Sequence, residues 1–149
     1  MYKHIMLPLD GSEDLSIKAV QEGVALAQSI GAKLTLLTVV PPYRTGITTP
    51  LTADLVHEVE AGRDEEHRAR AQKTHAEIKA RAIAGKVDCD SLVVIGASPY
   101  EQIIDNARQR GCDLIVMASH GRKGLDALFT GSETVNVLTH SKIPVLVVR

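Results

Sequence analysis

The residues best suited to chemistry lie between Asp113 and Ser132, in a stretch rich in glycine, serine and basic side chains. A short apolar run at 114–117 opens this stretch, and a helical pattern begins at Gly131-Ser132. Backbone N–H groups become accessible where glycine removes the Cβ, and a helix N-terminus adds positive potential. A strand that leads through such a loop into a helix is typical of an anion site, so the stretch predicts one.

Three side chains in this loop could act on an anion directly, namely His120, Arg122 and Lys123. His120 could serve as a general base or donate to a phosphate, or it could simply pack within the loop. Arg122 and Lys123 could add positive charge, or they could be an exposed pair with no part in binding.

The loop must be positioned by the apolar runs and helical patterns that alternate along the chain. The expected strands are 4–9, 33–40, 90–96, 114–117 and 145–148, and the expected helices are 12–30, 52–84 with a break near Gly62, 98–111 and 132–140. This order predicts an α/β fold with a five-stranded parallel sheet, open and doubly wound, with helices on both faces, in a single domain spanning 1–149. Ligands bind such sheets beyond the carboxyl ends of the strands, where the strand order reverses, so the first and fourth strands are predicted to flank the site.

Apolar spacing also predicts which side chains of each helix face the core. They are Ile17, Val20, Val24 and Ala27; then Leu55, Val59, Ala69, Ala76, Ala80 and Ile83; then Ile103, Ile104 and Ala107; and last Val135 and Leu138. The charged run at 63–68 is predicted to be a solvated face. Ser12 is expected to cap the first helix, and Ser98 with Glu101 matches a capping box.

Pro8 breaks a local rule, because it lies in a predicted buried strand and cannot donate to a sheet ladder. A broken rule at a strand end often marks a functional site, although the proline could also simply end the strand. The connection at 41–50 is rich in proline and threonine and shows no periodicity, which is typical of a functional or mobile loop.

Composition excludes several classes of protein. The 149 residues carry a net charge of −1, 3% aromatic residues and no tryptophan, which argues against binding nucleic acid. The cysteines, Cys89 and Cys112, have no metal-binding spacing and are expected to be buried thiols. Neither a signal-peptide pattern nor an apolar run near about 20 residues is found, so we expect a cytoplasmic protein without a membrane span.

Six strings make the chain similar to the single-domain type of the universal stress protein (UspA-like) family over essentially its full length. They are L-P-L-D-G-S at 7–12, L-L-T-V-V at 36–40, V-V-I-G-A-S-P at 93–99, D-L-I-V-M-A-S-H-G at 113–121, G-S-E-T at 131–134 and P-V-L-V-V at 144–148. Nucleotide-binding members carry G-x2-G-x9-G-[S/T]. Here Gly121, the nine-residue spacing and Gly131-Ser132 agree, but Ala118 replaces the first glycine.

Alanine at position 118 would cost roughly 1 kcal/mol or more if the backbone there required a positive φ. It would be nearly harmless if the position needs only a small side chain. Ala118 directly follows the predicted strand, so we expect extended dihedrals and the harmless case.

The resemblance implies a Rossmann-like fold of the adenine nucleotide alpha hydrolase type, and a site for ATP, ADP or AMP, with or without Mg²⁺. Pro8, Asp10 and Val39 would hold adenine and ribose, Met117 and Ala118 would line the sugar, and Gly121, Gly131, Ser132 and Thr134 would donate to the phosphates, near His120 and Arg122. Glu133 would repel a triphosphate unless it turned to solvent, where it favours the helix N-terminus. AMP would tolerate this carboxylate better.

The leading hypothesis is therefore an adenine-nucleotide-binding regulatory protein of the stress response with little or no turnover. No GxxxxGK[ST] motif is present, and only His120 and Asp10 suggest a general base or a Mg²⁺ ligand, although slow ATP hydrolysis stays open. The alternative is an interaction module of the same fold that binds no nucleotide. A phosphoacceptor receiver domain is disfavoured, because Gly96-Ala97 follows the third strand where an acidic residue is expected. The resemblance also implies a homodimer through 144–148.

Overall fold

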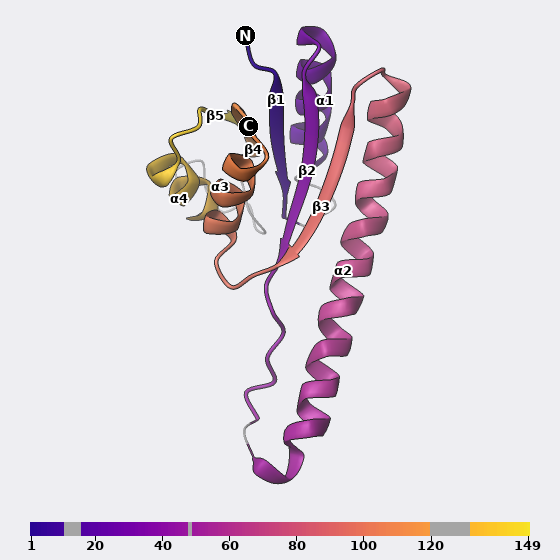
Figure 1. Cartoon of the computed structure of the whole chain (residues 1–149), viewed down its shortest axis with the longest axis vertical. Helices are drawn as coiled ribbons and strands as arrows, with labels where there is room; N and C mark the ends of the chain where they lie inside the picture. Colours follow the sequence, from indigo (N-terminus) through magenta and orange to yellow (C-terminus); the bar gives the residue numbers. More distant parts are fainter. Residues whose placement is uncertain (11–15, 48, 120–131) are drawn as a thin grey trace.

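The computed structural model describes residues 1–10, 16–47, 49–119 and 132–149, which form a parallel sheet with helices on both faces (Figure 1). The five strands lie in the order β3-β2-β1-β4-β5. The elements are β1 (His4–Leu9), α1 (Ser16–Ile30), β2 (Lys33–Val40), a 3₁₀ turn η1 (Pro50–Thr52), α2 (Ala53–Ala84), β3 (Cys89–Ile95), α3 (Pro99–Gln109), β4 (Leu114–Ala118), α4 (Ser132–His140) and β5 (Val145–Val148). The predicted doubly wound fold is confirmed, with strand boundaries within one residue of those expected.

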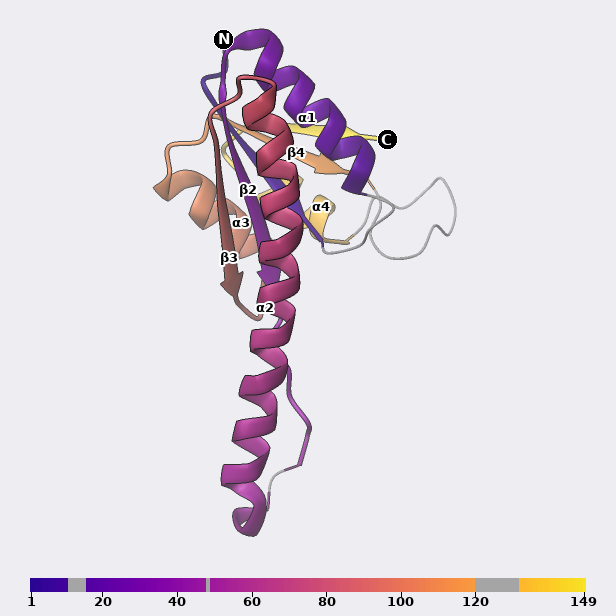
Figure 2. The same cartoon turned by 90° about the vertical axis from the view of Figure 1, so that its right-hand side faces the viewer.

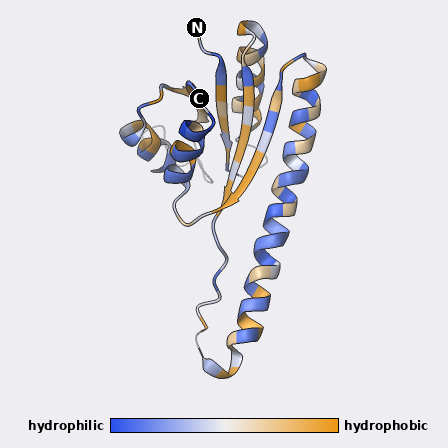
Figure 3. Ribbon diagram, viewed as in Figure 1, coloured by the Kyte–Doolittle hydropathy of each residue, from blue (hydrophilic) through white to orange (hydrophobic). Residues whose placement is uncertain are grey.

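Alternating side chains of the strands build a core on each face of the sheet. Leu7 and Leu36 belong to a buried cluster beneath α1 and α2, whereas Met6 and Leu37 belong to a second cluster beneath α3 and α4. Because both faces are covered, most strand residues are apolar, and Figure 3 shows hydrophobic stretches in the central strands. No helix within the described ranges is long and apolar enough to cross a membrane.

The predicted inward face of α1 is only partly correct. Ala27 is buried and Val20 and Val24 pack against the core, but Ile17 is 53% exposed. The helix instead approaches the sheet through small residues, because a Cβ on Gly23 would lie 3.2 Å from Leu7 Cδ1. Ala19, Gly23 and Ala27 follow one another at four-residue intervals and share the buried face, and Ile17, two residues before Ala19, lies outside it. α3 buries Ile103, Ile104 and Ala107 as expected, fully or in part.

The prediction for α2 is wrong in two respects. The helix runs through Gly62 without a break, and its buried side chains are His75, Ile78 and Ala82. All the side chains expected to face the core are exposed; they are Leu55, Val59, Ala69, Ala76, Ala80 and Ile83. The helix has two faces of low polarity. The prediction chose the more apolar one, whereas the face that packs on the sheet includes His75.

The N-terminal half of α2 projects beyond the sheet, with the segment 41–47 running beside it (Figure 2). A helix of 32 residues is about 48 Å long, whereas the eight residues of β2 span about 26 Å. We call the projecting helix half, with this segment, the arm.

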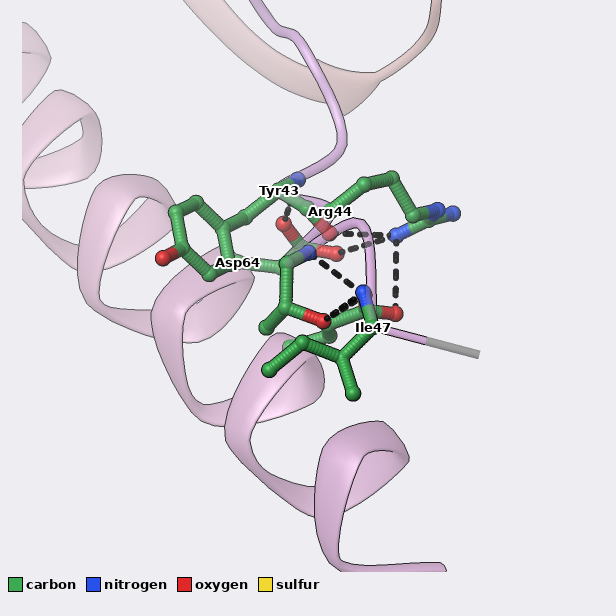
Figure 4. A network of polar contacts seen from close by, with 6 residues as sticks. Tyr43, Arg44, Ile47 and Asp64 are labelled. Atoms are coloured by element: carbon green, nitrogen blue, oxygen red, sulfur yellow. Dashed lines mark hydrogen bonds and ion pairs between the residues drawn. The ribbon is translucent and has the colours of Figure 1, made fainter. Parts of the chain in front are cut away.

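Two carboxylates of α2 hold the extended segment of the arm in place (Figure 4). Asp64 accepts a hydrogen bond from the Tyr43 N–H at 2.6 Å, and Glu60 accepts one from the Thr45 N–H at 2.8 Å. The Arg44 guanidinium lies 3.8 Å from both carboxylates. Because of these contacts, the Asp64 side chain is largely covered. The prediction that the whole charged run at 63–68 forms a solvated face is therefore wrong.

His75 occupies a buried position that sequence patterns did not identify. Its side chain is 1% exposed, its Nε2 lies 2.7 Å from Thr38 Oγ1 in a hydrogen bond, and its Nδ1 is buried with no partner in the described structure. Burial lowers the pKa of His75 from 6.5 to about 4, so the imidazole is neutral in the folded protein at neutral pH.

The pH dependence of stability should reveal this neutral imidazole. Below pH 6.5 the unfolded chain protonates His75 and the folded chain does not, so stability is lost as the pH falls from 6.5 towards 4. We expect His75 to contribute roughly 2 kcal/mol to the loss between about pH 7 and pH 5, measured by urea unfolding. His75→Gln, which does not titrate, should show a correspondingly smaller loss. An unchanged pH slope in that variant would contradict the assignment.

Lys86 should be a site where glycine stabilises the protein. It follows α2 with φ 62°, and the adjoining N–H groups of Lys86 and Val87 bond to the carbonyls of Ile83 and Ala82, which ends the helix. Because glycine adopts this conformation without strain, Lys86→Gly should raise the free energy of unfolding by about 1 kcal/mol in a denaturant titration. The matched control is Gly31→Ala, at φ +67°, which should lower it by a similar amount.

Candidate functional site

The strands β1 and β4 are paired only over the first part of their lengths. Their ladder includes Ile5 with Leu114 and Met6 with Ile115, and it does not continue beyond these pairs. On its other side, β1 stays paired with β2 as far as Leu9. β1 therefore loses one neighbour near its carboxyl end and keeps the other.

Pro8 explains why the ladder ends there. The Lys3 carbonyl accepts from Lys33 at the start of β2, and the His4 carbonyl accepts from Asp113 just before β4. Successive residues of β1 thus direct their backbone groups to opposite neighbours, and even-numbered residues face β4. Pro8 is the next even-numbered residue after the last pair, and it has no N–H to donate. The sequence prediction that this proline marks a site is consistent with its place in the sheet.

At the other end of β1, the Asp113 carboxylate holds the two strands together. Its oxygens accept from the Lys3 N–H at 2.9 and 3.0 Å and from the His4 N–H at 2.9 Å. Partial burial would raise the pKa of Asp113, but these hydrogen bonds lower it below its usual value. β1 and β4 are therefore fastened at their amino ends and separate at their carboxyl ends. These strands lie where the strand order reverses, which is the predicted position of a ligand site.

Ala118, which replaces the first glycine of the motif, has ordinary strand geometry. It is the last residue of β4 and pairs with Val148 of β5. Among the described residues other than glycine, only Lys86 has a positive φ. The expectation of extended dihedrals at Ala118 is confirmed, so alanine introduces no backbone strain at this position.

The first turn of α4 is attached directly to the end of β4. Thr134 is 4% exposed, and its hydroxyl donates to the Ala118 carbonyl at 3.1 Å. This bond sets the rotation of the helix, so Thr134 and Val137 face inward while Val135 and Leu138 are exposed. The predicted inward face of α4 is wrong for this reason.

The same bond changes the part that Thr134 can play. Its hydroxyl donates to the Ala118 carbonyl, so towards a ligand Thr134 would offer its backbone N–H as a donor or its hydroxyl oxygen as an acceptor. Ser119, which the sequence analysis did not single out, is also buried beside this contact, and its N–H donates to the Val148 carbonyl at 2.8 Å.

Glu133 does not turn wholly to solvent as expected. Its Oε2 is buried and has no hydrogen-bond partner among the described residues. The pKa of Tyr100 on α3 is raised mainly by its hydrogen bond to Glu101 and by the charge of that residue, and the charge of Glu133 raises it further. Glu133 therefore lies near enough to α3 for its charge to act there.

The side chains predicted to hold the base and the sugar come from three adjacent strands. Pro8 and Val39 are half-buried, and Val39 packs with Met117 on the α3 and α4 side of the sheet. Pro8 lies on the same face, because it is two residues beyond Met6. Met117 is only 6% exposed, so it contributes mainly to the core. Asp10 is exposed immediately after β1.

The remaining predicted site residues lie outside the described residues. They are His120, Gly121, Arg122 and Gly131, together with the side chain of Ser132 and the predicted helix cap Ser12. Ser132 itself is the first residue of α4. The N-terminus of this helix begins beside the end of β4, because Thr134 is bonded to Ala118.

Other parts of the described structure offer little chemistry. A hollow of about 520 Å³ lies in the arm between residues 44–47 and 49–50 on one side and α2 on the other, with a mainly apolar lining that includes Val56 and His57. Cys89 and Cys112 are buried as expected, and burial raises the pKa of each thiol to about 11. No group of three or more metal-binding side chains gathers within the ranges that are described.

Comparisons with known proteins agree with this architecture. A family model described as the universal stress protein family matches residues 1–149. The universal stress protein YxiE of Bacillus subtilis is 31% identical over 152 residues, covering all of both chains.

Two solved structures show the same fold. Universal stress protein UspA from Lactobacillus plantarum superposes with a TM-score of 0.81 at 27% identity, covering 99% of this chain and 98% of that one. A universal stress protein solved in complex with cAMP superposes with a TM-score of 0.70 at 26% identity, covering 99% and 97%. The full-length match, the relative and the shared sheet lead to one conclusion: the chain belongs to the universal stress protein family.

Proposed function

We propose that this protein binds an adenine nucleotide between the carboxyl ends of β1 and β4 and acts in the stress response as a regulator with little or no turnover. The observation that carries the proposal is the end of the β1–β4 ladder before Pro8, with the start of α4 bonded to the end of β4. The structural relative that was solved with cAMP supports an adenine nucleotide as the ligand class.

The residues at this edge fit such a ligand. Asp10 is exposed at the end of β1, where it can accept from ribose hydroxyls or hold a Mg²⁺ ion that accompanies the phosphates. Val39 offers an apolar edge to the base. The N-terminus of α4 is suited to the phosphates, and by the family motif Gly121 and Gly131 would offer backbone N–H groups to them. Ala118 keeps the small side chain that close approach of the sugar requires.

The charge near α4 favours a nucleotide with few phosphates. Glu133 has a shielded carboxylate oxygen in the first turn of this helix, and a triphosphate placed there would be repelled. AMP carries less charge than ATP, so we propose AMP as the better ligand. Hydrolysis of ATP would need a base such as His120, and any turnover is proposed to be slow.

A second candidate function is an interaction module of the same fold without a nucleotide. Two observations favour it. The Thr134 hydroxyl already donates to the Ala118 carbonyl, and the Met117 side chain is buried in the core, so neither group is directed to a ligand. The two candidates differ in whether the carboxyl edge of the sheet has measurable affinity for a nucleotide. In either case we propose a cytoplasmic protein that binds no nucleic acid.

Nucleotide affinity tests the proposal. AMP and ATP should bind in isothermal titration calorimetry, with AMP the tighter. Gly121→Val or Gly131→Val should weaken binding by at least about tenfold, which is about 1.4 kcal/mol, because the added side chain blocks the approach of a phosphate to the backbone. The matched control Ala61→Val adds bulk at an exposed position on the arm and should bind normally. Absence of binding by the unaltered protein would favour the interaction module.

We further propose a homodimer in which β5 pairs with its copy across a two-fold axis. β5 is the outer strand next to β4, and its Leu146 side chain is 43% exposed. The carbonyls of Pro144 and Val148 accept from β4, so the alternate residues Val145 and Val147 direct their backbone groups to the free edge. An apolar edge of this kind is usually covered.

A proline on this edge should abolish pairing through β5. Val147→Pro removes an outward N–H and leaves the bonds to β4 in place, so the mass in light scattering should fall by at least half. Val147→Thr keeps the N–H and should retain the mass of the unaltered protein. Equal masses for the two variants would contradict pairing through β5.

A further inference from the structure

The helix α2 has a second face of low polarity, opposite the face that packs on the sheet. His75, Ile78 and Ala82 face the sheet, and Glu60 and Asp64 continue the same side along the arm. The side chains predicted from sequence to be buried lie on the other side, where they are exposed. Figure 3 shows that α2 is largely hydrophilic, with apolar residues scattered along it.

This exposed face has the spacing of a helix–helix seam. Its positions follow one another at intervals of four and three; they are Leu55, Val59, Gly62, Glu66, Ala69, Lys73, Ala76, Ala80 and Ile83, and all of them are exposed. We call this set the outer seam. An alternation of four and three is typical of helices that pair along their length. The glycine and alanines near its middle would let two backbones approach closely.

We propose that the outer seam pairs with the outer seam of a second copy of this chain, with the two α2 helices antiparallel and Ala69 at the two-fold axis. This register places Leu55 of one copy beside Ile83 of the other. It places Gly62 beside Ala76 and Ala69 beside its own copy. Among the uncharged residues of the outer seam, the large side chains thus meet at the ends, and the small ones meet in the middle.

The charges within the outer seam match in the same register. Glu66 and Lys73 are equally far from the axis, to within one residue, so each lies beside the opposite charge of the other copy. Because of the two-fold symmetry, this pair occurs twice. A parallel arrangement would instead place Glu66 beside Glu66 and Lys73 beside Lys73. The charge pattern therefore selects the antiparallel orientation.

The charges that flank the seam match in this register as well. Glu58 faces Lys79 to within one residue, and Arg63 faces Glu77 to within two residues. Arg70 comes near its own copy, an unfavourable contact that Glu66, one turn earlier on the same helix, partly offsets.

The outer seam is separate from the β5 edge. α2 packs against β2 and β3, which lie at the other end of the sheet from β5. A chain could use both surfaces at once, so pairing through α2 would join β5-linked dimers into larger assemblies. In the proposed arrangement the arm of each copy lies along the C-terminal half of the partner's α2, where Ala76 and Ala80 are exposed.

Cross-linking across the axis tests the register. Ala69→Cys should form a disulfide-linked dimer under mild oxidation, because its two copies would face each other within reach of a disulfide. The matched control is Ala61→Cys, also exposed on α2, whose two copies would be about 24 Å apart in this register. We expect cross-linking of the first variant to be at least about tenfold faster, since pairing raises the effective concentration of its thiols. The native thiols, Cys89 and Cys112, are buried and should not interfere. Equal rates for the two variants would overturn the proposal.

A charge exchange tests the orientation independently. Starting from Val147→Pro, which removes the β5 contact, Glu66→Lys or Lys73→Glu should each weaken self-association by at least about tenfold in sedimentation velocity. The double variant Glu66→Lys with Lys73→Glu should restore it, because the opposite charges meet again. A double variant as weak as the single ones would overturn the antiparallel pairing, as would a monomeric Val147→Pro protein at every concentration tested.

Discussion

The missing N–H of Pro8 is the constraint on which the site depends. The ladder between β1 and β4 could continue towards their carboxyl ends if the residue at position 8 had an N–H to donate to β4. Pro8 is the first residue after Met6 whose backbone faces β4, so the ladder with β4 ends there while pairing with β2 continues. The Asp113 carboxylate fastens the amino ends of the same strands. The absence of one N–H group, at Pro8, thus accompanies the separation of β1 from β4, where the strand order reverses.

The start of α4 is bonded to the end of β4, which is one of the two strands that separate. Its first turn is anchored by Thr134, whose hydroxyl bonds to the Ala118 carbonyl at the end of β4. The helix N-terminus, with its positive potential, therefore lies beside the separated strands. Ala118 can replace glycine here because the residue is extended and needs no positive φ. One carboxylate oxygen of Glu133 is buried in the first turn of α4, where it would repel a highly charged ligand. The proposed preference for AMP over ATP follows from this position.

The strands and the site position could be predicted from sequence because long apolar runs and turn residues are local signals. The faces of three helices could not be predicted as reliably. α1 approaches the sheet through Gly23, α4 is turned by the hydroxyl of Thr134, and α2 buries His75 against Thr38. In each case a small or polar residue makes the contact, and apolar spacing gives no signal for it. On α2, the apolar spacing predicted that residues of the outer seam would be buried, but they are exposed.

The central claim is that the opening beside Pro8 holds an adenine nucleotide. An ¹⁵N-labelled sample titrated with AMP would test it most directly, by the backbone amide signals that shift. We expect shifts at Asp10, Ser119 and Thr134, on the three segments that meet at the carboxyl edge, with the signals of the arm unchanged. Shifts concentrated around Val56 in the arm, or no shifts at millimolar AMP, would contradict it.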